Sequence, residues 1–300
     1  MDNQSLHVPS VYIIILNYNN PEDTIACVEE AEKISYGNFK IVIVDNKSTD
    51  NSEALLKEKF PHHTFFQTGA NLGYAGGNNI GMKYAKDQGA DYICVLNNDV
   101  ITNPDFLQKL LDYLEANPKV GVVGPRVCEY DEPHIVQSTG AMIDFHTGRV
   151  NIINNGVHED QLKGEIIPCD YVGGACLLFN SNILEKVGYF PEDYFLFYEE
   201  TEWCLEIKKK GFGVICYCDA KVVHKGSASI NQISGLSEYF MYRNVVIFMK
   251  RNAKLNQRLV FYSYSMLYAI YRGLIKKEGL KFINYFYHGL TEKNKYDKKL

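Results

Sequence analysis

The sequence predicts an α/β fold with a mainly parallel central sheet flanked by helices, followed by a helical C-terminal tail. Strand-like and helix-like segments alternate over the first 120 residues. The strand-like runs are almost continuously apolar, which is typical of parallel strands that are covered on both faces. From about Leu236 the chain reads as helices that are dense in Tyr, Phe and Lys.

Four strands and four helices alternate in the first part of the chain. The strands are indicated by β-branched and aromatic runs. The helices are indicated by apolar residues at helical spacing after a proline, a capping residue or a glycine. Strands are expected at residues 11–16, 40–45, 63–68 and 92–97, and helices within residues 17–34, 48–60, 75–89 and 103–118.

After residue 120 the pattern changes to strand-like segments joined by turns. Strands are expected within residues 120–130, 141–153, 169–180 and 213–218, with a hairpin tip at His146–Gly148 and a helix over residues 198–211. His224 is expected in a polar turn after the last of these strands.

The charge of the chain is unevenly distributed. From Tyr242 onward there are 13 Lys and Arg against 3 Asp and Glu, a net charge of +10, whereas the preceding 241 residues carry 18 against 33, or −15. A basic tail on an acidic body predicts contact with something anionic. We expect one domain over residues 1–235, which the change of pattern near residue 120 divides into two halves, and a C-terminal region over residues 236–300.

Cysteine usage and apolar stretches predict a cytoplasmic protein. The eight cysteines occur singly in apolar surroundings, which favours reduced core residues over disulfides or a zinc site. The start "MDNQSLHVPS" lacks the basic and apolar stretches of a secretion signal. The apolar stretch 259–271 is shorter than the about 20 residues of a spanning helix. Nucleic acid is not an expected partner, because basic residues gather only in the tail and form no recognised motif.

Polar side chains follow three of the predicted strands. In open parallel sheets, ligands bind beyond the carboxyl ends of the strands. Asp45 suits the ring N–H and ribose hydroxyls of a nucleotide, and Asp99 suits a divalent cation such as Mg²⁺ or Mn²⁺. Each of these residues could instead be a helix cap or a turn former. Polar clusters at one sheet edge favour a ligand site, and they comprise Asn17, Asn19, Asp45, Asn46, Asn97, Asn98, Asp99 and the glycine-rich residues 71–81.

A glutamate cluster lies in "YEETEWC", at the expected start of a helix. Glu199, Glu200 and Glu202 would favourably face the helix dipole there, which is one interpretation. The other is that one of them is a general base, with a pKa raised by neighbouring carboxylates and aromatic side chains. His224 is likewise either a structural histidine or a ligand.

Taken in order, nine segments resemble family 2 glycosyltransferases of the GT-A fold, in particular their bacterial rhamnosyltransferase-like branch. The resemblance spans roughly residues 11–244. It implies a nucleotide-sugar-binding half over residues 1–120 and an acceptor and catalytic half over residues 121–235. The segments are "IIILNYNN", "IVIVDNKSTDNS", "NLGYAGGNNIG", "VLNNDV", "QSTGAMIDFHTGR", "DYVGGACLLF", "GYFPEDYFLFYEETEWCLEIKKKG", "VVHKGSAS" and "YFMYRN".

The resemblance implies a role for each matching position. A nucleotide-sugar donor would be bound by Asn17, Asn19, Asp45, Asn46, Gly76, Gly77, Asn78, Asn97, Asn98 and Arg243. The acceptor would meet Gly173, Gly174, Ala175 and Trp203. Asp99 and His224 would hold a divalent metal, Mn²⁺ or Mg²⁺. Glu200 would be the catalytic base, with Glu199 and Glu202 as alternatives. Asn244 would approach the phosphates or the acceptor beside Arg243.

The implied activity is metal-dependent, inverting transfer of a sugar from a nucleotide-sugar, such as dTDP-rhamnose. The acceptor would be a glycan or a lipid-linked molecule of bacterial cell-surface polysaccharide synthesis. Three positions depart from the family pattern: Asn97 replaces an acid, Glu200 stands where Asp is commoner, and Glu206 stands where a basic residue is usual.

These departures keep open a second hypothesis, a non-catalytic scaffold that binds nucleotide or glycan in an assembly complex. A sugar nucleotidyltransferase would need a basic, glycine-rich triphosphate loop near the N-terminus, and "NYNNPEDT" contains no Lys or Arg.

The tail suggests a location for the protein. Residues 239–287 combine many aromatics with Lys and Arg, which is typical either of a packed helical core with a basic face or of a segment that lies on an anionic membrane. The second interpretation would place the protein peripherally at the inner face of the plasma membrane.

Overall fold

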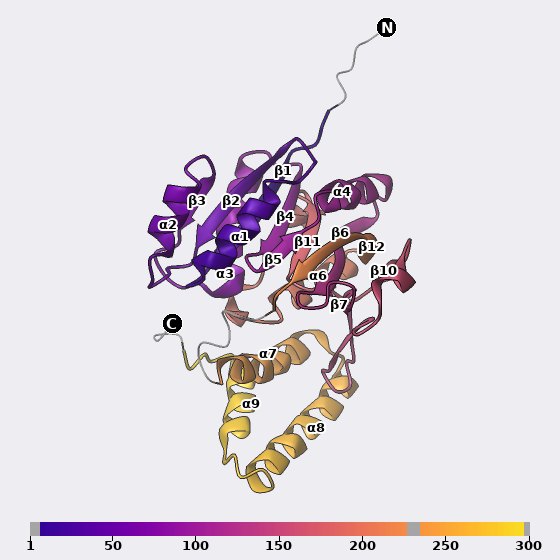
Figure 1. Ribbon diagram of the computed structural model, residues 1–300. Helices are drawn as coiled ribbons and strands as arrows, with labels where there is room; N and C mark the ends of the chain where they lie inside the picture. Colours follow the sequence, from indigo (N-terminus) through magenta and orange to yellow (C-terminus); the bar gives the residue numbers. More distant parts are fainter. Residues whose placement is uncertain (1–6, 227–234, 297–300) are drawn as a thin grey trace.

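The computed structural model describes residues 7–226 and 235–296. A sheet with helices on both faces forms the larger part, and α7 to α9 lie below it (Figure 1). The helices are α1 (Pro21–Ala31), α2 (Ser52–Lys59), α3 (Gly73–Asp87), α4 (Phe106–Ala116), α5 (Ile183–Val187), α6 (Glu199–Lys209), α7 (Leu236–Asn252), α8 (Leu255–Leu274) and α9 (Lys281–Thr291), with the short 3-10 helices η1 (Glu159–Leu162) and η2 (Glu192–Tyr194). The strands are β1 (Val11–Asn17), β2 (Phe39–Asp45), β3 (Thr64–Gln67), β4 (Tyr92–Asn97), β5 (Val100–Thr102), β6 (Val120–Glu129), β7 (Val136–Ser138), β8 (Ala141–Ile143), β9 (Val150–Ile152), β10 (Ile166–Pro168), β11 (Cys176–Asn180) and β12 (Gly213–His224).

The central sheet has the order β10-β12-β6-β11-β4-β1-β2-β3. Strands β3, β2, β1 and β4 are parallel, and β6 and β12 pair parallel to each other. Strand β11 runs antiparallel between β4 and β6. In this register Asn17 is opposite Asp45, and Leu16 is opposite Asn97, so the polar residues that end β1, β2 and β4 lie side by side.

Two apolar layers cover the sheet because β1 alternates its side chains between the faces. Val11, Ile13 and Ile15 pack with α1, α2 and α4 on one face. Tyr12 and Ile14 pack with α3, α5 and α6 on the other. This three-layer arrangement buries almost every residue of the central strands.

The C-terminal helices have their own core. Tyr239, Phe240, Phe282 and Tyr285 form one cluster, and residues of α7 such as Phe248 form another with Tyr198 and the β8–β9 hairpin. Most aromatic side chains of the tail are therefore packing residues. Within residues 7–226 and 235–296, no helix is both long enough and apolar enough to cross a bilayer.

The α/β fold with a mainly parallel sheet is confirmed, and the eight cysteines are free and buried. Two predicted boundaries were wrong. The last strand continues to His224, which ends β12 instead of lying in a turn, because β5 and β6 pair with this extension. In the segment 169–180, only Cys176–Asn180 is a strand. The division at residue 235 stays a prediction. In "VVHKGSAS", residues 227–229 lie outside the described part, as do residues 1–6 of the N-terminal stretch.

Candidate active site

A cavity of about 620 Å³ lies at the carboxyl ends of β1, β2 and β4. Its volume is within the range of small-molecule sites. The start of α6, the loop before β11 and the end of β12 complete its wall. Eleven residues predicted for the site line it: Asn19, Asn46, Asn97, Asn98, Asp99, Gly173, Gly174, Ala175, Glu199, Glu200 and His224.

Asp99 and His224 meet at the metal-binding position that the sequence predicts. Nε2 of His224 lies 3.1 Å from Oδ1 of Asp99. On the other side of the ring, Nδ1 lies 2.8 Å from the amide oxygen of Gln137, which can only accept a hydrogen bond. The proton therefore sits on Nδ1, and Nε2 is available as a ligand. A carboxylate oxygen and an oriented imidazole nitrogen fit a divalent cation such as Mn²⁺.

A second group of metal-ligating side chains lies on the surface, outside the cavity wall. Oε1 of Glu32 is 2.8 Å from Nε2 of His62 and 3.0 Å from Nε2 of His63. These three side chains pair with one another. The pair formed by Asp99 and His224 is the metal candidate because it faces a cavity of ligand size.

Glu199 and Glu200 form a buried pair of carboxyl groups. Burial raises the pKa of Glu200 to about 7. Hydrogen bonds from the backbone N–H groups of Glu200 and Gly174 act in the opposite direction and lower this pKa. Burial also raises the pKa of Glu199 well above its usual value, and the charge of Glu200 adds to this. Burial therefore favours the protonated form of both carboxyl groups, and Glu200 titrates near pH 7. Within the described ranges, Oε2 of each residue is buried and has no hydrogen-bond partner.

Asn17 and Asp45 are fully buried behind the cavity wall and are hydrogen-bonded to each other. Nδ2 of Asn17 donates to Oδ2 of Asp45 (2.7 Å), and Nε2 of Gln67 donates to Oδ1 (2.8 Å). Oγ1 of Thr24 donates to Oδ1 of Asn17 (2.7 Å). Both side chains thus use their polar atoms within the protein and do not line the cavity, contrary to the predicted direct contact with the donor. The wall is formed by the neighbouring residues instead.

Gly76, Gly77 and Asn78 pack α3 and do not reach the cavity wall, which corrects the prediction from the glycine-rich run. A Cβ on Gly77 would lie 2.4 Å from the side chain of Leu16, so its absence permits close packing of α3 on β1. Nδ2 of Asn78 donates to the carbonyl oxygen of Tyr74 (3.0 Å). The part of the run that lines the cavity is its start, Asn71, Gly73 and Tyr74.

The backbone before Glu199 adopts a strained conformation. Phe195, Phe197 and Tyr198 have φ values of 67°, 67° and 76°, in the left-handed region that non-glycine residues rarely adopt. Each such residue costs about 1–3 kcal/mol and persists only where surrounding contacts hold it. Gly73 contributes one contact, because a Cβ there would lie 2.1 Å from the carbonyl oxygen of Phe195.

Asn244 and Arg243 of α7 hold this loop. Nδ2 of Asn244 lies 3.0, 2.7 and 2.9 Å from the carbonyl oxygens of Tyr194, Leu196 and Phe197. Nη1 and Nη2 of Arg243 donate to the carbonyl oxygen of Asp193 (3.2 Å). Both α7 residues are fully buried and neither lines the cavity. This corrects their predicted approach to the donor phosphates or the acceptor, because their donors bind main-chain carbonyls of the loop that leads to Glu199 and Glu200.

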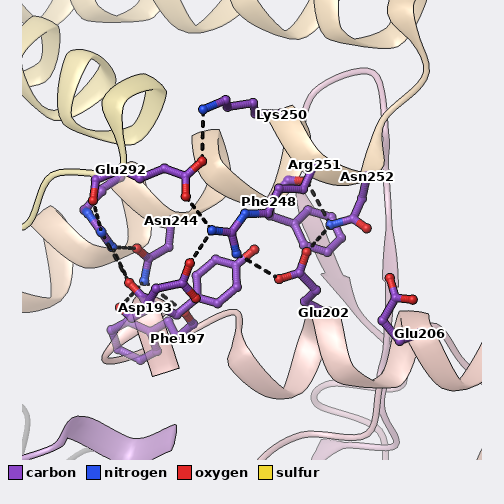
Figure 2. A network of polar contacts seen from close by, with 12 residues as sticks. Asp193, Phe197, Glu202, Glu206, Asn244, Phe248, Lys250, Arg251, Asn252 and Glu292 are labelled. Atoms are coloured by element: carbon purple, nitrogen blue, oxygen red, sulfur yellow. Dashed lines mark hydrogen bonds and ion pairs between the residues drawn. The ribbon is translucent and has the colours of Figure 1, made fainter. Parts of the chain in front are cut away.

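Glu202 points to α7 and not into the cavity. Figure 2 shows Arg251 between the carboxylates of Asp193, Glu202 and Glu292. Nδ2 of Asn252 donates to Oε1 of Glu202 (2.7 Å). Of the three candidate bases, the structure therefore leaves Glu199 and Glu200 in contact with the cavity.

Trp203 is part of the core and does not face an acceptor site, which corrects its predicted role. Its side chain is 1% exposed and forms edge-to-face contacts with Phe179 and Phe190. Nε1 donates to the carbonyl oxygen of Gly188 (2.9 Å). Trp203 therefore packs α6 against the sheet.

Sequence reasoning did not assign three residues that shape the cavity. The hydroxyl of Tyr74 donates to the carbonyl oxygen of Gly174 (2.8 Å), and Gln137 orients His224. Tyr171 lies in the cavity wall with Gly173 and Gly174. All three lie inside segments that carry the family resemblance. The sequence therefore indicated the segments, but the residue types did not indicate these three positions.

The family of the chain follows from a comparison of its sequence. The profile of glycosyl transferase family 2 matches residues 12–188, more than half of the 300 residues. The chain belongs to this family. The predicted family is thereby confirmed.

Two curated relatives are similar to this family 2 member over most of their length. The low-salt glycan biosynthesis hexosyltransferase Agl10 of Haloferax volcanii is 26% identical over 214 residues, which are 70% of this chain and 66% of that protein. The N-acetylglucosaminyl-diphospho-decaprenol L-rhamnosyltransferase of Mycobacterium tuberculosis is 25% identical over 209 residues, which are 61% of this chain and 66% of that protein. The chain thus spans about two thirds of each relative.

Solved structures support the fold of this family 2 member. The mannosyltransferase PcManGT from Pyrobaculum calidifontis, solved with GDP-Man and Mn²⁺, superposes with a TM-score of 0.57 at 15% identity. The match covers 96% of this chain and 77% of PcManGT. The GT-A fold predicted from the sequence is confirmed.

Proposed function

We propose that the protein is a metal-dependent inverting glycosyltransferase that uses a nucleotide-sugar donor. The observation that carries this proposal is the joining of two features in one cavity: the Asp99–His224 pair, and Glu200 with its pKa of about 7. The rhamnosyltransferase-like resemblance and the two curated relatives favour transfer of rhamnose or another hexose. We propose dTDP-rhamnose as the first donor to test.

The donor side of the mechanism rests on Asp99 and His224. A divalent cation bound there would stabilise the negative charge of the nucleoside diphosphate as it leaves. The Nδ1–H of His224 bonds Gln137, so the ring is fixed with Nε2 toward the cavity. Asn97 and Asn98 line the same wall and offer polar groups beside this position.

The base side rests on Glu200. Its carboxylate takes the proton from an acceptor hydroxyl, and the hydroxyl oxygen attacks the anomeric carbon on the face opposite the diphosphate. The bond between the anomeric carbon and the diphosphate oxygen breaks in the same displacement, which inverts the configuration. Burial and the charge of Glu200 raise the pKa of Glu199 well above its usual value, which favours its protonated form. Glu200 is therefore the base we propose from this pair.

The acceptor would approach over Gly173, Gly174 and Ala175. Among the residues that the structure describes, nothing lies within 4 Å of the position where a Cβ of Gly173 would be, so this part of the wall leaves space. A Cβ on Gly174 would lie 3.2 Å from Oε1 of Glu200, so this glycine brings the wall close to the base. We propose a glycan or lipid-linked acceptor of cell-surface polysaccharide synthesis, and a cytoplasmic enzyme at the inner face of the plasma membrane.

Calorimetric titration with dTDP, UDP and GDP, each with and without Mn²⁺, tests the donor side. We expect one nucleotide to bind in a metal-dependent way. Asp99→Asn should abolish the metal dependence, whereas Asp105→Asn, the matched change of an exposed acid on α4's N-terminus, should preserve it.

Failure of all three nucleotides to bind, with or without metal, would overturn the proposal. Nucleotide binding without release of nucleotide from any sugar donor in the presence of acceptor extracts would favour the scaffold hypothesis instead.

A further inference from the structure

The outward face of α8 is mainly apolar, and its exposed polar residues are Asn256 and Ser263. Leu267 and Leu274 are 67% and 74% exposed, and they stand on the same side of α8, seven residues or two turns apart. The remaining exposed apolar side chains on or directly after this helix are Leu255, Leu259, Val260, Tyr264, Ile270, Tyr271 and Ile275. At 1.5 Å per residue the helix is about 30 Å long, so these side chains form an extended stripe. The helix itself lies at the far end of the molecule from β1 (Figure 1).

Charged side chains within α8 turn away from this stripe. Arg258 and Arg272 are the charged residues between Leu255 and Leu274. Nη1 of Arg258 donates to the carbonyl oxygen of Lys250 (3.3 Å). The guanidinium of Arg272 binds both carboxylate oxygens of Glu278. A solvated surface helix normally carries charges on its outer face, so the stripe is exceptional for a surface in water.

The inner face of α8 accounts for its attachment to the protein. Phe261, Ser265 and Ala269 are buried at helical spacing against α7 and α9. The aromatic residues that made the tail resemble a membrane segment in sequence are mostly in this packed layer. The exposed stripe is a separate feature made mainly of aliphatic side chains.

Basic residues stand at both ends of the stripe. Lys254 precedes the helix, and Lys276 and Lys277 follow it, all exposed. Arg149 of the neighbouring β8–β9 hairpin reaches the hydroxyl of Tyr264 (3.0 Å). The acid of that hairpin, Asp144, is bound by the backbone and hydroxyl groups of its own turn.

We propose that the outward face of α8 docks on an anionic phospholipid bilayer, with the helix lying in the plane of the interface. Apolar side chains would enter the boundary between headgroups and acyl chains, and the flanking lysines would meet anionic headgroups. The two tyrosines of the stripe suit this boundary because each has an apolar ring and a polar hydroxyl. The proposal deepens the membrane contact proposed above and depends on the proposed function only for its purpose, which is access to a lipid-linked acceptor.

The distribution of charge disfavours a second copy of the chain as the occupant. If two α8 helices paired antiparallel about a two-fold axis, Lys254 of each copy would face Lys276 and Lys277 of the other. If they paired parallel, each lysine would face its own equivalent. Both arrangements bring like charges together at the ends of the contact. An anionic surface complements the same lysines.

Flotation of the full chain with vesicles tests the proposal. We compare phosphatidylcholine vesicles with vesicles that also contain phosphatidylglycerol, at low and at high salt. The wild type should float with the anionic vesicles, and less so at high salt because the lysine contribution is screened. The variant L259N/L267N/L274N should lose at least about tenfold in vesicle partition, because three apolar groups leave the interface.

The variant V8N/I166N is the matched control, because it changes exposed apolar residues of the sheet domain that do not line the cavity. It should float like the wild type. Thermal unfolding of both variants should match that of the wild type, since all five side chains are exposed. Binding of nucleotide should also be unchanged in both, because none of α8 lines the cavity. Vesicle binding therefore reports on α8 even if the proposed donor chemistry fails.

Three results would overturn the proposal. The first is a wild type that does not float with anionic vesicles. The second is an α8 variant that floats as well as the wild type. The third is a lipid-free dimer, detected by light scattering, that the α8 variant dissociates. This last result would assign the face to a second copy.

Discussion

The two sides of the cavity are held by different kinds of structure. On the proposed donor side, Asn46, Asn97 and Asp99 stand at or just after strand ends, and the register of a parallel sheet brings those ends together. On the base side, Glu199 and Glu200 follow a strained loop that α7 holds from about 50 residues further along the chain. The donor side is thus a local consequence of the sheet, whereas the base side depends on a long-range contact.

The largest expected effect is a loss of turnover without a loss of nucleotide affinity, which would separate the base side from the donor side. Glu200→Gln should lower turnover by about 10³-fold, because a general base contributes roughly 10²–10⁴-fold. Nucleotide affinity should stay within twofold, since the donor side is untouched. Steady-state kinetics of nucleotide release, together with calorimetric binding, measures both quantities. Equal losses in turnover and binding would show that Glu200 is a donor-site residue and not the base.

The pH dependence of turnover should report on the same carboxyl group. Because the base acts when ionised, turnover should rise about tenfold per pH unit below the pKa of about 7 and level off above it. Glu200→Gln should remove this rise. A profile of kcat that is flat between pH 5.5 and 8 in the wild type would contradict the assignment.

The stability of the fold should change with pH in the opposite sense. Burial raises the pKa of Glu200 above its unfolded value of about 4.5, so the folded state retains a proton that the unfolded state has lost. The free energy of unfolding should therefore fall as pH rises from about 4.5 to 7. Urea unfolding of the wild type and of Glu200→Gln would isolate this contribution, because the glutamine does not titrate.

Asn244→Ala should break the base side while leaving the donor side intact. The variant removes the donor that three buried carbonyl oxygens share, so we expect the free energy of unfolding to fall by about 3 kcal/mol. We also expect turnover to fall about tenfold at a temperature at which the variant is folded, with unchanged nucleotide affinity.

Asn252→Ala is the matched control on the same helix. It removes a hydrogen bond to Glu202 but no bond to the loop carbonyls, so turnover should stay close to that of the wild type. If Asn244→Ala lowered stability but left turnover of the folded protein unchanged, Asn244 would be a structural residue without a positioning role.

The difference between the two sides also explains what the sequence could predict. Strand ends are visible in sequence, because an apolar run stops and polar residues follow, as in Asn97 and Asp99. The targets of Asn244 and Arg243 are not visible, because an amide or guanidinium near a site can bind either phosphates or main-chain carbonyls. Only the fold shows that the carbonyls of residues 193–197 are within reach.

Burial caused two further errors of the same kind. Trp203 lies three residues after Glu200 in sequence, close to one helical turn, but its side chain packs against Phe179 and Phe190 in the core. Gly77 belongs to a run that does reach the cavity, but its own neighbour is Leu16. In both cases the segment was identified correctly, and the direction of the side chain depended on contacts far away in the chain.

Glu202→Gln should have the smallest effect of these substitutions. It tests whether a glutamate close to Glu200 in sequence has only a structural role. Glu202 is two residues from Glu200 but binds Arg251 and Asn252 on α7, so its charge serves the attachment of the loop and not the chemistry (Figure 2). Because the ion pair with Arg251 is partly solvent-exposed and Arg251 keeps two other carboxylates, the free energy of unfolding should fall by about 1 kcal/mol or less. Turnover should change less than threefold, and its pH profile should keep the wild-type midpoint. A turnover loss comparable to that of Glu200→Gln would mean that the loop turns Glu202 toward the substrate during the reaction. Glu202 would then not be a structural residue separate from the catalytic pair Glu199 and Glu200.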